Sequence, residues 1–205
     1  MYKRQLLLRA GALGLNTSVS AWGYQIELGA FATSHIPTAA SSVTRSADSA
    51  VMTGTNFSSW YNQSEGTFII SGATYSPTTD TGDRYFFYAH NSGDVSNRIR
   101  VLRTLGTSAN YDIASGGVVQ ASFVGGSLTT LPAKLAVGYR VNDFAFVDDG
   151  AILNTDSAGS VPVTITALAI GSAATLGTAV INGWIASLTY YRTRLPNDTL
   201  RRLTQ

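Results

Sequence analysis

The strongest constraint on the fold is an alternation of apolar and polar residues with a period of two, repeatedly interrupted by glycine, serine, asparagine or aspartate. Leu135, Val137 and Tyr139 occupy alternate positions, and the same spacing recurs at Trp184, Ala186, Leu188 and Tyr190. In residues 98–101, Ile99 and Val101 face one way and Arg98 and Arg100 face the other, and Asp149 with Gly150 predicts a tight turn. Successive side chains of a strand point to opposite faces, so this pattern indicates strands with one buried face. About ten such stretches separated by turn residues predict an all-β sandwich or barrel.

Charge content excludes several classes of protein. Charged residues make up only 13% of the 205 residues, with two lysines and two glutamates, so long amphipathic helices and coiled coils are excluded. A net charge of +2 is too small for a protein that binds nucleic acid. The chain has no apolar stretch long enough to span a membrane, and no cysteine for a disulfide, a thiol nucleophile or a zinc site.

The organisation along the chain predicts two parts: an arm, strand and linker over residues 1–47, and a β-domain over residues 48–205. Residues 1–20 start basic and turn apolar like a signal peptide, but Arg9 interrupts the short apolar run, which leaves a docking arm as the alternative. Near the other end, Pro196 is suited to the first turn of a helix. Leu195, Leu200 and Leu203 would then form a short apolar stripe on a C-terminal helical turn.

Several segments resemble tail and fibre proteins of tailed bacteriophages and prophages. The stretch W-G-Y-Q-I-E-L-G-A-F-A-T-S-H-I-P-T, followed by V-T-R-S-A-D, resembles a segment that joins β-domains in those proteins. N-F-S-S-W-Y-N-Q-S-E-G-T, K-L-A-V-G-Y-R-V-N-D-F-A-F-V-D-D-G and N-G-W-I-A-S-L-T-Y-Y-R-T-R-L-P-N-D-T-L resemble their concanavalin A-like lectin/glucanase domain. The resemblance spans residues 22–204, although this chain is shorter than usual fibre proteins.

The resemblance implies a concanavalin A-like jelly-roll sandwich of two antiparallel sheets. It also implies a place in a virion, an extracellular particle, as a tail or fibre-type appendage. Such appendages are often trimeric, contact other virion proteins and recognise glycans at the host surface. We therefore expect a homo-oligomer, with a trimer favoured.

Catalytic groups are sparse in the sequence. Glucanases of this fold carry closely alternating carboxylates, whereas the two glutamates here, Glu27 and Glu65, lie far apart. Asp148 and Asp149 are adjacent, so strand geometry points them to opposite faces. His35 and His90 lie in no nucleophile-elbow motif, and packing or capping roles are expected for them. The sequence predicts no catalytic residue and a protein that is not an enzyme.

Candidate ligand-binding residues lie in loops and turns. Aromatic rings stack on sugars, and Tyr75 and Tyr111 stand in segments rich in glycine, serine and asparagine. Asn142, Asp143 and Asp149 could hydrogen-bond sugar hydroxyls. The Asp- and Asn-rich turns near Asp80, Asn91 and Asn142 could also hold calcium, but each is an ordinary turn composition, so no metal or cofactor is predicted.

The arm is the expected partner-binding segment. A charge-poor surface is desolvated at low free-energy cost, and an alternating strand separated by a linker can add to the sheet edge of a neighbour. The residues expected to contact a partner are apolar: Leu6, Leu7, Leu8, Trp22, Tyr24 and Ile26. Two alternatives to a glycan-binding virion protein remain: a purely structural or decoration virion protein, and a secreted bacterial glycan-binding or glycan-hydrolysing protein.

Overall fold

The computed structural model describes residues 26, 35–37, 41–43, 50–74, 82–92, 94–104, 108–128, 132–175 and 178–205. The chain divides into two units, Met1–Ser46 and Ala47–Gln205. The second unit holds all the helices and strands described below.

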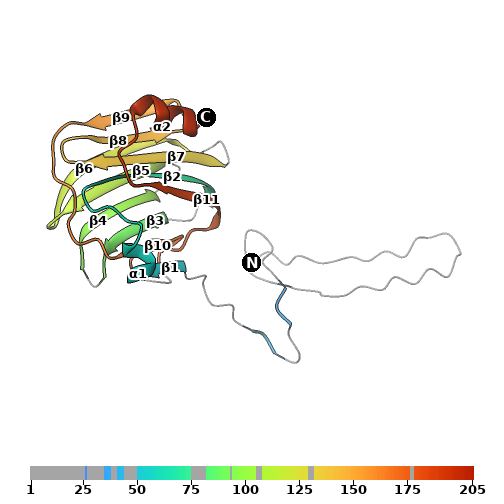
Figure 1. Cartoon of the computed structure of the whole chain (residues 1–205). Coiled ribbons are helices and arrows are strands. Elements are labelled where there is room, and N and C mark those ends of the chain that lie inside the picture. Colours follow the sequence, from blue (N-terminus) through green and yellow to red (C-terminus); the bar gives the residue numbers. More distant parts are fainter. Residues whose placement is uncertain are drawn as a thin grey trace, which may run out of the picture. The chain divides into compact units, whose positions relative to one another are not determined.

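The described residues of the second unit form eleven strands and two short helices (Figure 1). In chain order they are β1 (Ala50–Thr53), α1 (Thr55–Ser58), β2 (Glu65–Thr74), β3 (Arg84–Asn91), β4 (Asp94–Arg103), β5 (Ser108–Ser115), β6 (Val118–Ser127), β7 (Ala133–Arg140), β8 (Phe144–Asp148), β9 (Ile152–Asp156), β10 (Ala167–Ile170), β11 (Gly183–Tyr191) and α2 (Asn197–Leu203). A six-stranded sheet has the order β1-β10-β3-β4-β5-β6, and a five-stranded sheet has the order β11-β2-β7-β8-β9. Neighbouring strands are antiparallel throughout, so the predicted two-sheet sandwich and the short C-terminal helix are confirmed.

The core lies between the two sheets and follows from the alternation. In the five-stranded sheet, Phe68 pairs with Val137, which pairs with Phe146, and all three are fully buried. The ring of Phe68 meets that of Phe87, from the other sheet, with 4.6 Å between centroids. Each side chain of this size stabilises the fold by about 1.5–3 kcal/mol when fully buried. These inward rows therefore hold the two layers together.

Two tight turns set the register of the five-stranded sheet. Asp149 and Gly150 have φ values of 45° and 68° in the turn between β8 and β9, where the Ala151 amide donates to the Asp148 carbonyl oxygen at 3.1 Å, which confirms the turn expected there. Asn142, between β7 and β8, has a φ of 56°. Asparagine, aspartate and glycine adopt this left-handed conformation more readily than other residues, so the local sequence favours both hairpins.

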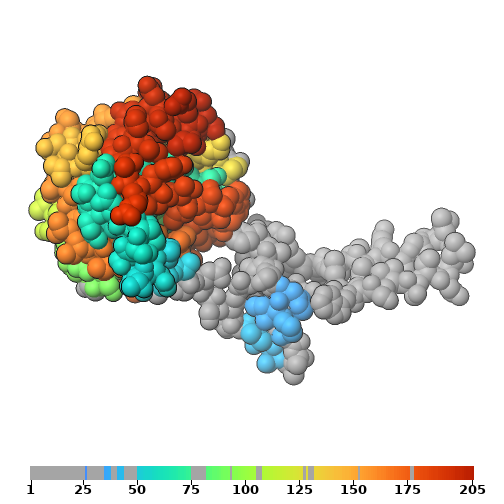
Figure 2. Space-filling model, viewed as in Figure 1, coloured from blue at the N-terminus to red at the C-terminus, as the bar shows by residue number. Residues whose placement is uncertain are grey.

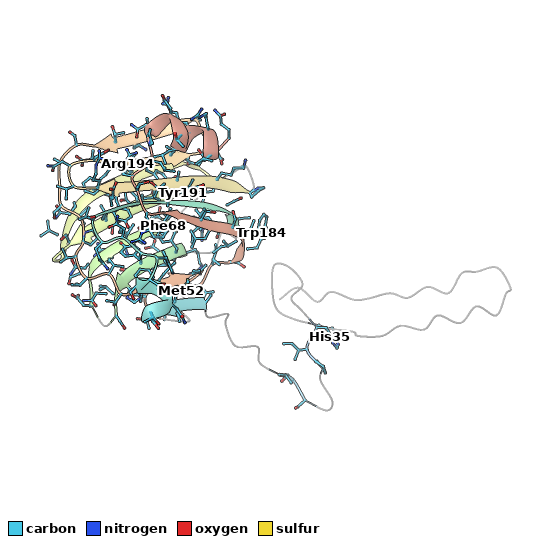
Figure 3. The ribbon with its side chains drawn as sticks, in the orientation of Figure 1. His35, Met52, Phe68, Trp184, Tyr191 and Arg194 are labelled. Carbon is cyan, nitrogen blue, oxygen red and sulfur yellow. The ribbon has the colours of Figure 1, made fainter. Side chains whose placement is uncertain are left out.

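The face assignment expected for residues 184–190 is wrong, because β11 carries a bulge between Ile185 and Ser187. Leu188 and Tyr190 pack against the core as expected, but Ile185 joins them. Trp184 is 43% exposed and projects away from the sheet (Figure 3). One additional residue in a strand shifts the alternation by one position, so the residues before the bulge face the opposite way.

Candidate functional site

A cluster of charged and aromatic side chains occupies the outer face of the six-stranded sheet. Ile99 and Val101 of β4 are buried in the core, so the intervening Arg98 and Arg100 face outward, as the sequence indicates. Strand pairing places Arg100 beside Tyr88 of β3 on one side and Asp112 of β5 on the other. We call Tyr85, Tyr88, Arg98, Arg100 and Asp112 the Arg–Tyr cluster.

One carboxylate joins the two arginines of the cluster. Arg98 donates from Nε to Asp112 Oδ1 at 2.7 Å and from Nη2 to Oδ2 at 3.3 Å. Arg100 donates from Nε to the same Oδ1 at 3.1 Å. Two guanidinium groups and one carboxylate leave an excess of one positive charge among these three residues, so the cluster favours an anionic ligand.

The two tyrosines form a floor beneath Arg100. Its guanidinium carbon lies 5.7 Å from the ring centroids of both Tyr85 and Tyr88, within the range of a cation–π contact. Arg100 Nη1 also donates to Tyr85 Oη at 3.2 Å. Burial raises the pKa of both phenols, partly opposed by the positive charge of Arg100. The tyrosines therefore stay neutral and hold the guanidinium in place.

His90 borders the cluster, opposite Arg98 in the pairing of β3 with β4. Its Nδ1 lies 2.9 Å from the carbonyl oxygen of Asn91, which favours the tautomer that donates from Nδ1. Nε2 is then an acceptor, and it is buried with no hydrogen-bond partner among the described residues. The expected capping role of His90 at the strand end fits the bond to Asn91.

The arrangement suits binding through the arginines. The side chains of Arg98, Arg100 and Asp112 are 16%, 23% and 13% exposed, so each keeps some surface that a ligand can reach. Tyr85 and Tyr88 are only 7% and 5% exposed, which leaves too little ring surface to stack on a sugar. Guanidinium groups pair with carboxylates through two parallel hydrogen bonds. This face therefore presents charge and donors that suit an anion.

Tyr111 is a correction to the sequence prediction. It lies in β5, is fully buried and stacks on Phe123 at 5.7 Å between centroids, so it is not an exposed loop residue that can bind a ligand. The serine and asparagine residues around it suggested a loop. The apolar residues Ala109, Tyr111 and Ile113 at alternate positions were the signal for a strand, and all three are fully buried.

Asn142 and Asp143 lie in the turn between β7 and β8 and make structural contacts. Asn142 Oδ1 accepts a hydrogen bond from the Gly159 amide at 3.0 Å. Asp143 pairs with Arg140 at 2.7 Å and with Arg194 at 3.0 Å. Both side chains are thus already engaged, although Asn142 is exposed and Asp143 is partly exposed.

Asp149 lies at the other end of β8 and so is not brought together with Asn142 and Asp143. Its Oδ1 accepts from the Lys134 amide at 2.7 Å, which fixes the β8–β9 turn to β7. The neighbouring Asp148 is largely buried and accepts from the Gly126 amide at 2.7 Å. Burial raises the pKa of Asp148, and the adjacent Asp149 adds to the rise.

Several predicted residues lie outside the described part of the chain: Tyr75, Leu6, Leu7, Leu8, Trp22 and Tyr24. Ile26 is described, and 91% of it is exposed. Within the described ranges, no three His, Cys, Asp or Glu residues form a group that could hold a metal ion. No helix in the same ranges is long and apolar enough to cross a membrane.

The sequence did not reveal the Arg–Tyr cluster as a site. It showed that Arg98 and Arg100 share a face, but Asp112 and Tyr88 come from neighbouring strands whose register is set by tertiary pairing. The usable signal was local: outward arginines on a strand in a chain that is otherwise poor in charge.

Comparison of the sequence with protein-family profiles finds no match, and comparison with curated proteins finds no similar sequence. Solved structures are similar in fold. The CBM40 of the Ruminococcus gnavus IT-sialidase, bound to α2,3-sialyllactose, has a TM-score of 0.59 at 14% identity over 70% of this chain and 84% of that one. NanB of Streptococcus pneumoniae has a TM-score of 0.60 at 10% identity over 76% of this chain and 26% of that one.

A third similar structure is the heptameric SAP-like pentraxin of Limulus polyphemus, with a TM-score of 0.53 at 10% identity over 69% of this chain and 70% of that one. At these identities the likeness concerns the fold alone. The predicted concanavalin A-like jelly-roll sandwich is therefore confirmed.

Proposed function

We propose that this chain is a non-catalytic glycan-binding protein that takes an acidic sugar on the Arg–Tyr cluster. The observation that carries the proposal is the pair of arginines, Arg98 and Arg100, held on one carboxylate with a net positive charge at an accessible face. The solved CBM40 of similar fold is described as bound to sialyllactose, which is an acidic sugar. A carboxylated glycan matches the charge and the donors that this face presents.

The engagement of the carboxylates supports a binding role over hydrolysis. Glycoside hydrolysis needs two carboxyl groups flanking a bound sugar. Here Asp112 holds two arginines, Asp143 holds Arg140 and Arg194, and Glu65 accepts from the Arg194 amide at 2.9 Å. Each of these carboxylates has a structural role that a catalytic role would disturb.

The resemblance of residues 22–204 to phage tail and fibre proteins supports a place on a virion, where the sandwich would contact a host glycan. A structural or decoration protein without glycan affinity is the alternative. Detection of the chain by mass spectrometry in purified particles of the virus that encodes it tests the placement, and its absence from them would contradict it.

Titration of the full chain with 3′-sialyllactose and with lactose tests the binding proposal. We expect heat or chemical-shift changes with sialyllactose and none with lactose at the same concentration. Arg100→Lys keeps the charge but loses the Nη1 bond to Tyr85 and the planar guanidinium, so affinity should fall at least about tenfold.

Arg140→Lys is the matched control, because Arg140 pairs with one aspartate in an exposed turn of the other sheet. It should bind like the unmodified protein. Equal binding of lactose and sialyllactose, or full affinity in the folded Arg100→Lys protein, would contradict an acidic-sugar site here. No binding to any sugar on a glycan array would leave the structural role.

A further inference from the structure

An apolar groove lies on the open side of the sandwich, between the edges of the two sheets. It has a volume of about 210 Å³, and the residues that line it include Met52, Trp60, Leu168, Ile170, Leu188 and Tyr190. Met52 and Ile170 come from the six-stranded sheet, whereas Leu188 and Tyr190 come from β11 at the edge of the other sheet. We call this the edge groove. Met52 and Phe68, labelled in Figure 3, mark its position.

The strand beside the groove has an unprotected edge. β11 runs for nine residues, from Gly183 to Tyr191, without a charged residue or a proline, and among the described strands it pairs with β2 alone. Proteins usually protect such edges with charges, proline or a covering segment. The opposite side of the sandwich is joined across the sheets, where Asn154 Nδ2 donates to the Val124 carbonyl oxygen at 3.3 Å.

The chain itself contains a segment that fits this side. Residues 22–28 carry Trp22, Tyr24, Ile26 and Leu28 at alternate positions, so an extended strand there would present one wholly apolar face. Ile26, the one described residue of this segment, is 91% exposed. A face of this kind needs an apolar partner.

We propose that residues 22–28 of one copy pair with the free edge of β11 in a second copy and place their apolar side chains in its edge groove. Backbone hydrogen bonds to β11 would give the strand its position, and the groove would select the apolar face. Residues 29–49 join the segment to β1, which supplies Met52 to the groove. Twenty-one extended residues span up to roughly 70 Å, which is ample for reaching a neighbouring copy.

The pairing is head-to-tail, because the arm of one copy meets the groove of the next. Such contacts close into rings when the rotation between copies allows it. The expected trimer is one such ring. The proposal stands independently of glycan binding, which uses the outer face of the six-stranded sheet.

Two variants of the full chain that add the same charge at neighbouring positions test the proposal. Ile26→Asp puts a carboxylate on the apolar face, whereas Gln25→Asp puts it on the opposite face. By light scattering, the unmodified protein and Gln25→Asp should form oligomers, and Ile26→Asp should have the mass of a single chain. Gln25→Asp should melt like the unmodified protein, whereas Ile26→Asp should melt at a lower temperature because it loses the stabilisation that pairing between copies contributes.

Three outcomes would overturn the proposal. An unmodified protein that stays monomeric shows that no copies pair. Oligomers that persist in Ile26→Asp show that another surface, such as β11 paired with β11, joins the copies. A lowered melting temperature of Ile26→Asp with no change in mass shows that the arm covers the groove of its own chain.

A crosslinking experiment locates the contact. Because the chain has no cysteine, Ile26→Cys on one copy and Met52→Cys on a second, differently tagged copy can be joined by a short bis-maleimide only between copies. We expect this mixed product, and none when Val124→Cys on β6 replaces Met52→Cys, although Val124 is 64% exposed. Equal yields at the two positions, or no mixed product with Met52→Cys, would overturn the assignment of the groove.

Discussion

The outer faces of the two sheets are built from similar strands, but one face is partly exposed and the other is covered by the C-terminal segment. On the six-stranded sheet, Arg98 and Arg100 lie over a carboxylate and two tyrosines, and their side chains remain 16% and 23% exposed. On the five-stranded sheet, the C-terminal segment covers the face, and Arg194 is only 3% exposed. In Figure 2 the C-terminal residues, in red, form a continuous surface over this part of the molecule.

The difference shows how a covering segment changes what an arginine can do. Arg194 donates to Asp143 at 3.0 Å and to Asn197 at 2.6 Å, so it fastens the segment before α2 to the β7–β8 turn. Burial lowers its pKa, opposed by the charge of Asp143. Arg100 is 23% exposed and is not covered in this way by the described residues, so it can meet a ligand. One face therefore contributes stability and the other is available for recognition.

Leu200→Ala should have the largest effect, because Leu200 is fully buried between α2 and the apolar side chains of the five-stranded sheet. Removing a buried leucine leaves a cavity, and the free energy of unfolding should fall by about 2–4 kcal/mol. Urea denaturation measures the loss. Sialyllactose affinity at a temperature where the variant is folded should not change, and a drop in affinity would mean that the two faces are not independent.

Asp112→Asn should lower both stability and affinity. The variant leaves two partly buried guanidinium groups without their shared carboxylate, so unfolding should become easier by about 1–2 kcal/mol. The guanidinium groups also lose their fixed positions, and sialyllactose should bind at least about tenfold more weakly despite the added positive charge. Tighter binding would show that charge alone governs recognition, without the geometry of the cluster.

Asp143→Asn tests whether the five-stranded sheet contributes to stability alone or also to glycan binding. Asp143 is 34% exposed, but it is the charge partner of Arg194, which is only 3% exposed, so the free energy of unfolding should fall by about 1–2 kcal/mol. Thermal melting measures this change. Affinity for the glycan should stay the same, and a loss of binding would move the site to the β7–β8 turn that the sequence suggested.

Asp148→Asn should have the smallest effect and a distinctive pH dependence. Burial raises the pKa of Asp148 above its ordinary value of 3.8, so the folded state holds the proton more tightly than the unfolded chain. Protonated Asp148 therefore contributes to the free energy of unfolding. This contribution is complete below pH 3.8 and is lost as the pH rises through the pKa of the folded state. Asparagine does not titrate. As the pH rises from about 3 to about 6, the melting temperature of the variant should therefore increase relative to that of the unmodified protein, by an amount that corresponds to less than about 1 kcal/mol in the free energy of unfolding. A constant difference across this range would contradict the shift.

Much of the fold could be predicted from the sequence, because a strand with one buried face shows a local alternation of apolar and polar residues. The alternation identified β7 and β4, and the Asp149–Gly150 pair identified the hairpin between β8 and β9. β5 was missed because its polar residues resemble those of a loop, and the bulge in β11 changed the direction of Trp184. A bulge depends on the partner strand, which a period of two does not reveal.

The candidate site was only half predictable for a related reason. Outward arginines follow from the strand pattern of β4 alone. Their meeting with Tyr88 and Asp112 depends on the register of three strands, in which Tyr88, Arg100 and Asp112 share one row. The residues chosen instead, Asn142, Asp143 and Asp149, have the side chains that sugars favour, but turns use the same side chains to bond their own backbone.

The position of β2 between β7 and β11 has a consequence for how the chain acquires its structure. β2 is synthesised early, but the hydrogen-bond partners of two of its residues are synthesised much later. Glu65 accepts from the Arg194 amide, 129 residues further along the chain, and Thr67 accepts from the Leu195 amide. Contacts this distant along the chain slow the search for the native state, and domains dominated by them fold in milliseconds to seconds. Until β11 arrives, the strand that carries Phe68 and Ile70 keeps an open edge, and this interval is when newly made chains are most prone to aggregate.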